Sequence, residues 1–212
     1  MSGRIYSSVN QAVFERIPAT ARSVLDVGCG DGTLGEALKR RAPCTVTGIT
    51  DSREEHDIAA SSLDAVVLAD IERADFSQLG RFDAIVCSHV LEHLRDPRRV
   101  LFQLRSRLAA DGRLVVALPN PLVWRQRVEF TAGRFRYTQG GIMDDTHLRF
   151  FDWVTASHLV ESSGYHVLEA FADGGLPGSR FLPRFLAAWL DRIATVQCPG
   201  LFGVQFVITA RP

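Results

Sequence analysis

The sequence predicts an α/β fold in which a mostly parallel sheet carries helices on both faces. Short, nearly continuous apolar runs alternate with segments that have the 3.6-residue period of amphipathic helices. Strands buried on both faces show such runs, and alternating strands and helices form parallel pairs with right-handed crossovers. A glycine-spaced turn follows the first apolar run. Such a turn is typical of strand–turn–helix units that bind nucleotide-like ligands.

Seven strands and three helices are expected in this order along the chain. The strand candidates are Ser23–Val27, Cys44–Ile49, Ala65–Ala69, Ala84–Ser88, Leu114–Leu118, Tyr165–Phe171 and Phe202–Ala210. The helical patterns are Thr33–Arg41, Pro97–Leu108 and Asp152–Ser163. Asp96 is the expected N-cap of the second helix, and Asp111-Gly112 is expected to turn the chain into the fifth strand.

The composition favours one globular domain spanning residues 1–212. Lys plus Arg equals Asp plus Glu, 24 against 24, so no nucleic-acid partner is expected. Neither a signal peptide nor a transmembrane segment is apparent, which favours the cytoplasm. The cysteines lack C-x-x-C spacing and are expected to be free thiols, most of them buried. They are Cys29, Cys44, Cys87 and Cys198.

The glycine turn is the most informative motif in the chain. It reads Leu25-Asp26-Val27-Gly28-Cys29-Gly30-Asp31-Gly32. A dinucleotide fingerprint would need its third glycine where Thr33 stands. A buried carboxylate at Asp26 needs a cationic or hydrogen-bonding partner. An amino-acid head group and a sulfonium would supply one, whereas a pyrophosphate would be repelled. The motif therefore argues against a nicotinamide-dependent oxidoreductase.

These eight residues resemble the first motif of class I S-adenosylmethionine (SAM)-dependent methyltransferases. The resemblance implies SAM as the cofactor. It also implies a Rossmann-like sheet of seven strands, mostly parallel with an antiparallel last strand. The alternative is a Rossmann-like domain that binds another nucleotide or no ligand.

Cofactor-binding residues are expected where the strands end, because open α/β sheets bind ligands there. On the pattern of the family, we assign the cofactor to Asp26, Gly28, Cys29, Gly30, Thr50, Asp51, Asp70, Ile71, Ser88 and His89. The ribose acid of the family is displaced by one position here. Asp51 therefore either reaches the ribose, leaves it to Thr50, or caps the next helix. Asp70 either accepts from the adenine amine or only starts a turn.

A second motif follows the fourth strand, where His89, Glu92 and His93 have the spacing i, i+3, i+4. In some related quinone-biosynthesis O-methyltransferases, a Glu-x-x-Glu-His at these positions binds a divalent metal. Here His89 replaces the first acid, and the set could hold zinc or a similar ion. The simpler interpretation is that Glu92 and His93 hydrogen-bond the loop. On the sequence alone we assign no metal, and we keep His93 as a candidate catalytic residue.

A third motif, Asp144-Asp145-Thr146-His147-Leu148-Arg149-Phe150-Phe151, precedes the last predicted helix. It resembles a segment of bacterial methyltransferases from polysaccharide and O-antigen loci, a group that grades into MetW-like proteins. We predict His147 as the general base, since its ordinary pKa suits neutral pH, and Asp145 as the acid that orients it. Arg149 would clamp an anionic substrate. Alternatively, His147 and Arg149 attach the insert to the sheet.

Two segments exceed the minimal fold and are expected to be inserts, a substrate-side lobe at about 120–151 and a second at about 176–200. Within the first, Pro121–Gly140 carries four arginines against one glutamate, which suits either an anionic substrate or a solvated lid. The second contains the apolar and basic stretch Phe181–Leu190. It is expected to be core or a homodimer face rather than a membrane contact.

The expected function is therefore SAM-dependent methyl transfer to a small-molecule or sugar acceptor, with a hydroxyl oxygen as the preferred nucleophile. Deprotonation of the hydroxyl would need a base. The alternative is a MetW-like accessory protein that has the methyltransferase fold and partners an acyltransferase.

Overall fold

The computed structural model describes residues 8–212 and contains one seven-stranded sheet of order β3-β2-β1-β4-β5-β7-β6. The neighbours among β1 to β5 pair in parallel, whereas β7 runs antiparallel to both β5 and β6. This is the predicted class of sheet. The strands are β1 Ser23–Val27, β2 Thr45–Thr50, β3 Ala65–Leu68, β4 Phe82–Ser88, β5 Leu108–Pro119, β6 His166–Gly174 and β7 Gly203–Arg211.

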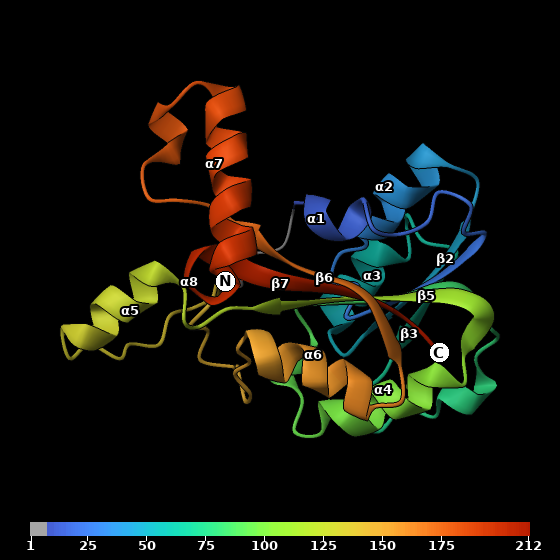
Figure 1. Cartoon of the computed structure of the whole chain (residues 1–212). Coiled ribbons are helices and arrows are strands. Elements are labelled where there is room, and N and C mark those ends of the chain that lie inside the picture. The colour runs from blue at the N-terminus through green and yellow to red at the C-terminus, as the bar shows by residue number, and fades with distance from the viewer. Residues whose placement is uncertain (1–7) are drawn as a thin grey trace.

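Helices cover both faces of the sheet, as predicted (Figure 1). One face carries α1 (Gln11–Phe14), α2 (Thr33–Arg41) and α3 (Arg53–Ala59), and the other carries α4 (Pro97–Arg105) and α6 (Trp153–Ser162). Successive strand residues point to opposite faces. Val24 therefore lies in the core under α1–α3, while the next residue, Leu25, packs in the core on the α4 and α6 side. A sheet buried in this way leaves its strand ends free to form a site.

The sequence located most elements to within three residues but missed local details. The predicted turn at Asp111-Gly112 is wrong, because both residues lie inside β5, where its register with β4 shifts. The helix α3 was not bounded from the sequence, and its N-cap is Ser52, whose hydroxyl accepts a hydrogen bond from the Glu55 amide. Asp96 caps α4 as predicted.

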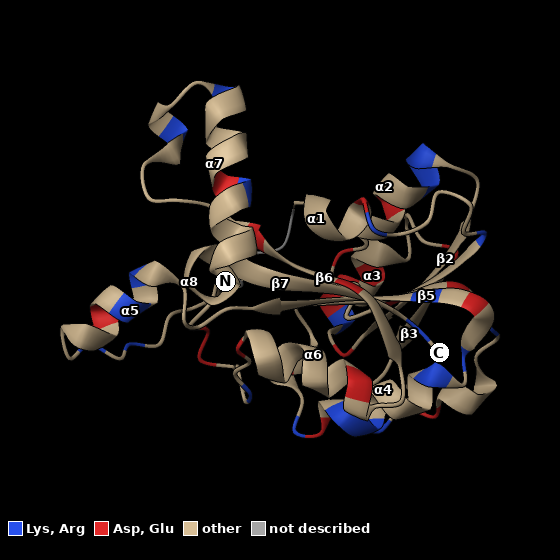
Figure 2. Cartoon of the chain, viewed as in Figure 1, with Lys and Arg blue, Asp and Glu red and all other residues tan. Residues whose placement is uncertain are grey.

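Two elements project from the sheet at the same end of the molecule in Figure 1, the helices α5 (Trp124–Thr131) and α7 (Arg184–Gln197). They fall within the two predicted inserts, and α5 contains no buried residue. The predicted core role of the second insert is wrong for its aromatic residues, since Phe181 and Phe185 are each 79% exposed. In Figure 2, basic residues mark the tip of α7, and both basic and acidic residues lie along α5.

Between Ser8 and Pro212, no helix has both the length and the apolar character needed to span a membrane.

Candidate active site

A cavity of about 650 Å³ lies at the carboxyl ends of β1, β2, β3 and β4. This volume falls within the range of small-molecule sites. All ten residues assigned to the cofactor line it: Asp26, Gly28, Cys29, Gly30, Thr50, Asp51, Asp70, Ile71, Ser88 and His89. The sheet brings them together because the carboxyl ends of neighbouring parallel strands meet at one edge.

The glycine turn brings the backbone to the cavity wall. Gly28 has a φ of +76°, and a Cβ atom at this position would lie 2.8 Å from Cγ2 of Val90. Gly30 has a φ of +52°, and a Cβ there would meet no atom within 4 Å. Both conformations favour glycine, but for different additional reasons. Gly28 allows close packing, whereas Gly30 leaves open space beside the cavity that a ligand can fill.

Asp26 is the most perturbed carboxyl group of the cavity. It is only 3% exposed, and burial raises its pKa to about 7. No hydrogen bond to its carboxylate occurs within residues 8–212. A buried carboxylate needs a partner that compensates its lost solvation. The chemistry of the site therefore fits a cationic ligand group such as an amino-acid ammonium.

The end of β2 presents two carboxyl groups rather than one. Asp51 is exposed and lines the cavity, and the interpretation of Asp51 as a helix cap is wrong because Ser52 fills that position. Glu55, in the first turn of α3, also lines the cavity and accepts a hydrogen bond of 2.7 Å from the Thr50 hydroxyl. The sequence analysis missed Glu55. Two features of the sequence could have indicated Glu55. The ribose acid is displaced to Asp51, and Glu55 follows it at a position expected in the first turn of the next helix.

Asp70 and Ile71 lie at the end of β3, beside the same cavity. Asp70 Oδ1 accepts a hydrogen bond of 2.9 Å from the Glu72 amide, so the turn role is present. The ligand role is compatible with it, because Asp70 also lines the cavity.

Ser88 and His89 lie at the end of β4, where His89 adopts a φ of +53°. A left-handed conformation is unfavourable for a residue other than glycine, and residues held in it cluster at active sites and ligand-binding sites. His89 Nε2 donates to Gln205 Oε1 at 2.9 Å, and Asn10 Nδ2 donates to the same oxygen at 2.8 Å. Asn10 also lines the cavity, and the sequence analysis missed it. The N-terminal segment therefore closes one side of the site.

His147 does not line the cavity. It is buried, its Nδ1 lies 3.2 Å from the Ile142 carbonyl oxygen, and its Nε2 lies 3.9 Å from Glu92 Oε1. Burial lowers the pKa of His147 despite the nearby Glu92 carboxylate. The predicted orientation by Asp145 is wrong. The Asp145 side chain is exposed and forms no hydrogen bond to His147, because the Ile142 carbonyl holds the ring instead.

His93, by contrast, lines the cavity together with Thr146. The Thr146 hydroxyl donates its single hydrogen to Asp144 Oδ1 and lies 3.0 Å from His93 Nδ1. The hydroxyl oxygen must then accept a hydrogen from Nδ1, which leaves Nε2 as the unprotonated nitrogen of the neutral ring. Of the three candidate catalytic residues, only His93 has the position and tautomer of a base at the cavity.

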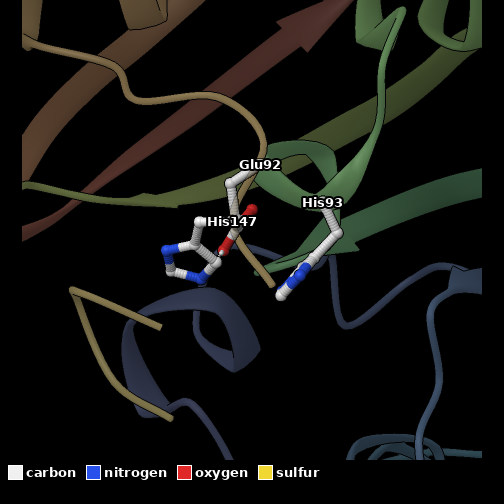
Figure 3. A group of neighbouring side chains, drawn as sticks. All are labelled: Glu92, His93 and His147. Carbon is white, nitrogen blue, oxygen red and sulfur yellow. Dashed lines mark ion pairs between the residues drawn. The ribbon is translucent and has the colours of Figure 1, made fainter. Parts of the chain in front are cut away.

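Glu92 links the two histidines. Both of its carboxylate oxygens are buried and lack a hydrogen-bond partner among the residues that the structure describes. Figure 3 shows Glu92, His93 and His147 directed toward one another, and one ligand atom from each lies within 4.8 Å of the others. One carboxylate and two imidazoles form a donor set that zinc and similar divalent ions accept. The residues present therefore fit a metal ion.

Backbone contacts attach this segment to the loop after β4. The amides of Leu148 and Arg149 donate to the Glu92 carbonyl at 2.9 and 3.0 Å. The Arg149 guanidinium donates to the carbonyl of Arg95. Arg149 thus performs the attaching role, and its guanidinium is already engaged by the protein.

The chain that forms this cavity is similar to a known protein family. A family model described as "Methyltransferase domain" matches residues 3–170. The chain belongs to this family. The fold and the family predicted from the glycine turn are thereby confirmed.

Relatives of this methyltransferase domain include ubiquinone biosynthesis O-methyltransferases. The mitochondrial enzyme of Schizosaccharomyces pombe is 36% identical over 110 residues, covering 49% of this chain and 40% of that protein. The enzyme of Xylella fastidiosa is 36% identical over 114 residues, covering 51% and 46%. The matched part is thus less than half the length of these relatives.

Solved structures show the same fold at low sequence identity. A SAM-dependent methyltransferase from Archaeoglobus fulgidus has a TM-score of 0.64 and 20% identity, covering 95% of this chain and 89% of that one. The [4+2]-cyclase SpnF has a TM-score of 0.62 and 22% identity, covering 94% and 79%. A cyclase among the neighbours illustrates that this fold alone does not specify methyl transfer.

Proposed function

We propose that this chain binds SAM in the cavity at the strand ends and transfers its methyl group to a hydroxyl oxygen of a small organic molecule. Family membership and the lining of the cavity support this proposal. The observation that carries it is Asp26, a buried carboxyl group without a partner within residues 8–212, next to a glycine turn with open space. A pyrophosphate would be repelled there, whereas the ammonium group of SAM would be bound.

Different residues of the chain would bind different parts of the cofactor. Asp26 would pair with the ammonium group, and the backbone at Gly28 and Gly30 would contact the methionine part. Asp51 and Glu55 would hold the ribose hydroxyls, and Asp70 would accept from the adenine amine. SAM supplies the methyl group as a sulfonium electrophile, so the protein mainly aligns the reactants and excludes water.

The acceptor would enter beside His93, at the part of the cavity lined by Thr146 and Leu148. An O-methyl transfer requires that the hydroxyl lose its proton. His93 Nε2 would take this proton where no cation occupies that nitrogen. A divalent cation held by His93 would instead lower the pKa of the hydroxyl, whose proton would then pass to solvent. His147 and Asp145 would not contact the acceptor, since one is buried behind Glu92 and the other is exposed away from it.

The acceptor class draws support from the ubiquinone-biosynthesis relatives, whose printed names specify O-methyl transfer. A hydroxylated aromatic ring is therefore our first choice of acceptor. The sugar or polysaccharide acceptor and the acyltransferase-partner role gain no support from these relatives. Of the four arginines in the first insert, Arg127 donates to the Leu122 carbonyl and Arg134 lies 3.7 Å from Glu129. The Glu129 carboxylate offsets the charge of Arg134, and the hydrogen bond to Leu122 engages one guanidinium nitrogen of Arg127.

Cofactor binding and methyl transfer can be tested separately. Isothermal titration calorimetry with SAM and with NAD measures which cofactor binds, and we expect micromolar or tighter binding for SAM only. Methyl transfer from labelled SAM is then measured for catechols, phenols and sugars. A protein that binds neither SAM nor its demethylated product would contradict the proposal. SAM binding without methyl transfer to any tested hydroxyl would support only the cofactor part of the proposal.

We also propose that 120–151 is a substrate-side lobe of a single domain and that the chain is cytoplasmic, since its four cysteines are free. A homodimer through α7 is a further proposal. Phe185, Trp189 and Val196 expose an apolar stripe at helical spacing. Light scattering coupled to size exclusion should show a dimer for the wild type and a monomer for Trp189→Glu.

A further inference from the structure

We infer that Glu92, His93 and His147 together hold a divalent cation, with His147 rather than His89 as the third ligand. The sequence motif after β4 pointed to His89, Glu92 and His93. The fold instead brings His147 to Glu92 from a segment 55 positions later in the chain (Figure 3). The ligand set therefore joins the loop after β4 to the segment that precedes α6.

Glu92 provides the first argument. The residue is 1% exposed, and neither carboxylate oxygen has a hydrogen-bond partner within the described part of the chain. A buried carboxylate without hydrogen bonds is strongly unfavourable unless a positive charge compensates it. Each nearby imidazole nitrogen is 3.4 Å or more away, with His147 Nε2 at 3.9 Å. A cation between these groups would supply the missing charge.

The two histidines provide the second argument. Metal-binding histidines almost always donate their other ring N–H to a protein acceptor, which fixes the ring. His147 Nδ1 has the Ile142 carbonyl oxygen at 3.2 Å, and His93 Nδ1 has the Thr146 hydroxyl at 3.0 Å. Both rings therefore present an unprotonated Nε2 as the free metal-ligand atom. This outer set of partners is what a metal site requires.

His89 does not fit the same site. Its Nε2 donates to Gln205 Oε1 and also faces Asn10 at 3.4 Å, so this nitrogen is directed to the N-terminal side of the cavity. Only Nδ1 faces Glu92, at 3.4 Å from Oε1. His89 is accordingly absent from the group whose ligand atoms lie within 4.8 Å of one another.

The spacing of the donors is close to what a bound ion needs. Zinc lies about 2.0–2.2 Å from imidazole nitrogen and carboxylate oxygen in tetrahedral geometry, so two of its ligand atoms are about 3.4 Å apart. The present group spans up to 4.8 Å. Small rotations of the side chains would close the difference.

The use of the cation, but not its binding, rests on the proposed function. His93 lines the cavity, so the ion would lie at its acceptor end. A divalent cation there would act as a Lewis acid and lower the pKa of an acceptor hydroxyl. The ion would also fix the segment around His147 against the loop after β4.

Zinc binding to the metal-free, untagged full-length protein tests the ligand set. Calorimetry after dialysis against EDTA should show one Zn²⁺ per chain. Glu92→Gln and His147→Ala should lose more affinity than the roughly 10–100-fold that loss of an outer partner costs. His89→Ala and the exposed surface control His158→Ala should bind Zn²⁺ as the wild type does. Circular dichroism confirms that each variant is folded.

Cobalt provides a positive test that does not depend on loss of function. The His147→Cys variant should bind Co²⁺ and add a near-ultraviolet thiolate-to-cobalt charge-transfer band that the wild type lacks. The matched His89→Cys variant should not add this band. Hydrogen exchange should also slow at residues 142–149 when Zn²⁺ is added to the wild type, but not to His147→Ala.

Three results would overturn the inference. They are absence of stoichiometric Zn²⁺ binding by the folded wild type, unchanged binding by His147→Ala, or the charge-transfer band in His89→Cys instead of His147→Cys. SAM binding, measured in EDTA on the same samples, reports the proposed function independently. A protein that binds SAM but not Zn²⁺ would contradict only the cation site.

Discussion

The Thr146 hydroxyl oxygen lies 3.0 Å from His93 Nδ1, although 53 positions separate the two residues in the sequence. Asp144 Oδ1 takes the hydroxyl hydrogen, so Thr146 must accept from His93. A side chain from the insert thus sets the tautomer of a histidine at the end of the sheet. Removal of this contact should disturb the acceptor side of the site and leave the cofactor side intact.

The Thr146→Val variant should lower kcat for methyl transfer by roughly 10–100-fold, because the His93 ring loses the partner that orients it. The dissociation constant for SAM should stay within about twofold of the wild type. Thr146→Ser keeps the hydroxyl and should restore most of the activity. Steady-state kinetics and calorimetry measure the two quantities. Equal activity of the Val and Ser variants would show that the hydrogen bond has no role in the reaction.

SAM affinity should depend on pH through Asp26. Its pKa is raised to about 7 in the cofactor-free protein, so the carboxyl group is mainly protonated at pH 6. Binding of an ammonium group favours the ionised form, which must first lose a proton. Below the pKa the affinity should therefore fall by about tenfold per pH unit, and above it the affinity should be level. Asp26→Asn should remove this dependence, as measured by calorimetry between pH 5.5 and 8.5.

The same variant should stabilise the protein without cofactor. Because the folded pKa of Asp26 exceeds the unfolded value, the unfolded state releases its proton first as pH rises. Stability is thus lost between about pH 4 and pH 7, by roughly 4 kcal/mol in total, because burial raises the pKa of Asp26 to about 7. Asp26→Asn should therefore raise the free energy of unfolding at pH 8 while it weakens SAM binding. Urea denaturation measures the first effect, and a less stable Asp26→Asn would contradict the burial argument.

The two carboxyl groups after β2 should contribute unequally to ribose binding. The Asp51 carboxylate makes no hydrogen bond within residues 8–212, whereas Glu55 already accepts one from Thr50. Asp51→Asn should therefore weaken SAM binding by about tenfold, in line with a hydrogen bond to a charged group. Glu55→Gln should weaken it less, and the exposed neighbour Glu54→Gln serves as the control. A larger loss of SAM affinity in Glu55→Gln than in Asp51→Asn would show that Glu55 contributes more to ribose binding than Asp51 does.

Alanine at the two turn glycines should separate folding from binding. Gly28→Ala adds a Cβ only 2.8 Å from Val90 at a left-handed φ, so both strain and a clash result. Gly30→Ala incurs the conformational cost alone, about 1–2 kcal/mol. Urea denaturation should therefore show a larger loss of stability for Gly28→Ala. Gly30→Ala should lose SAM affinity by more than its stability loss suggests, because its methyl group occupies the open space beside the cavity.

The cofactor half of the site could be predicted from the sequence because it consists of short motifs at strand ends. Apolar runs located β1 to β4, and the carboxyl ends of parallel strands converge by geometry. Asp26, Gly28 and Asp70 therefore reach one cavity as expected. Glu55 was missed because its role depends on the first turn of α3, whose boundary the sequence did not locate.

The proposed acceptor half of the site depends on contacts between distant segments. The sequence paired His147 with its neighbour Asp145, but the fold turns Asp145 outward and brings Glu92 to within 3.9 Å of the His147 ring. Local spacing likewise grouped His89 with Glu92 and His93, whereas the left-handed φ of His89 accompanies a ring directed to Gln205.

The sequence by itself thus determined the α/β sheet, the family and the position of the glycine turn, because these follow from local periodicity and from one contiguous motif. Only the tertiary structure decided which side chains line the proposed acceptor side of the cavity. That choice depends on how the chain after β5 folds back onto the loop after β4. The backbone hydrogen bonds from Leu148 and Arg149 to the Glu92 carbonyl hold this arrangement, and no pattern within either segment specifies them.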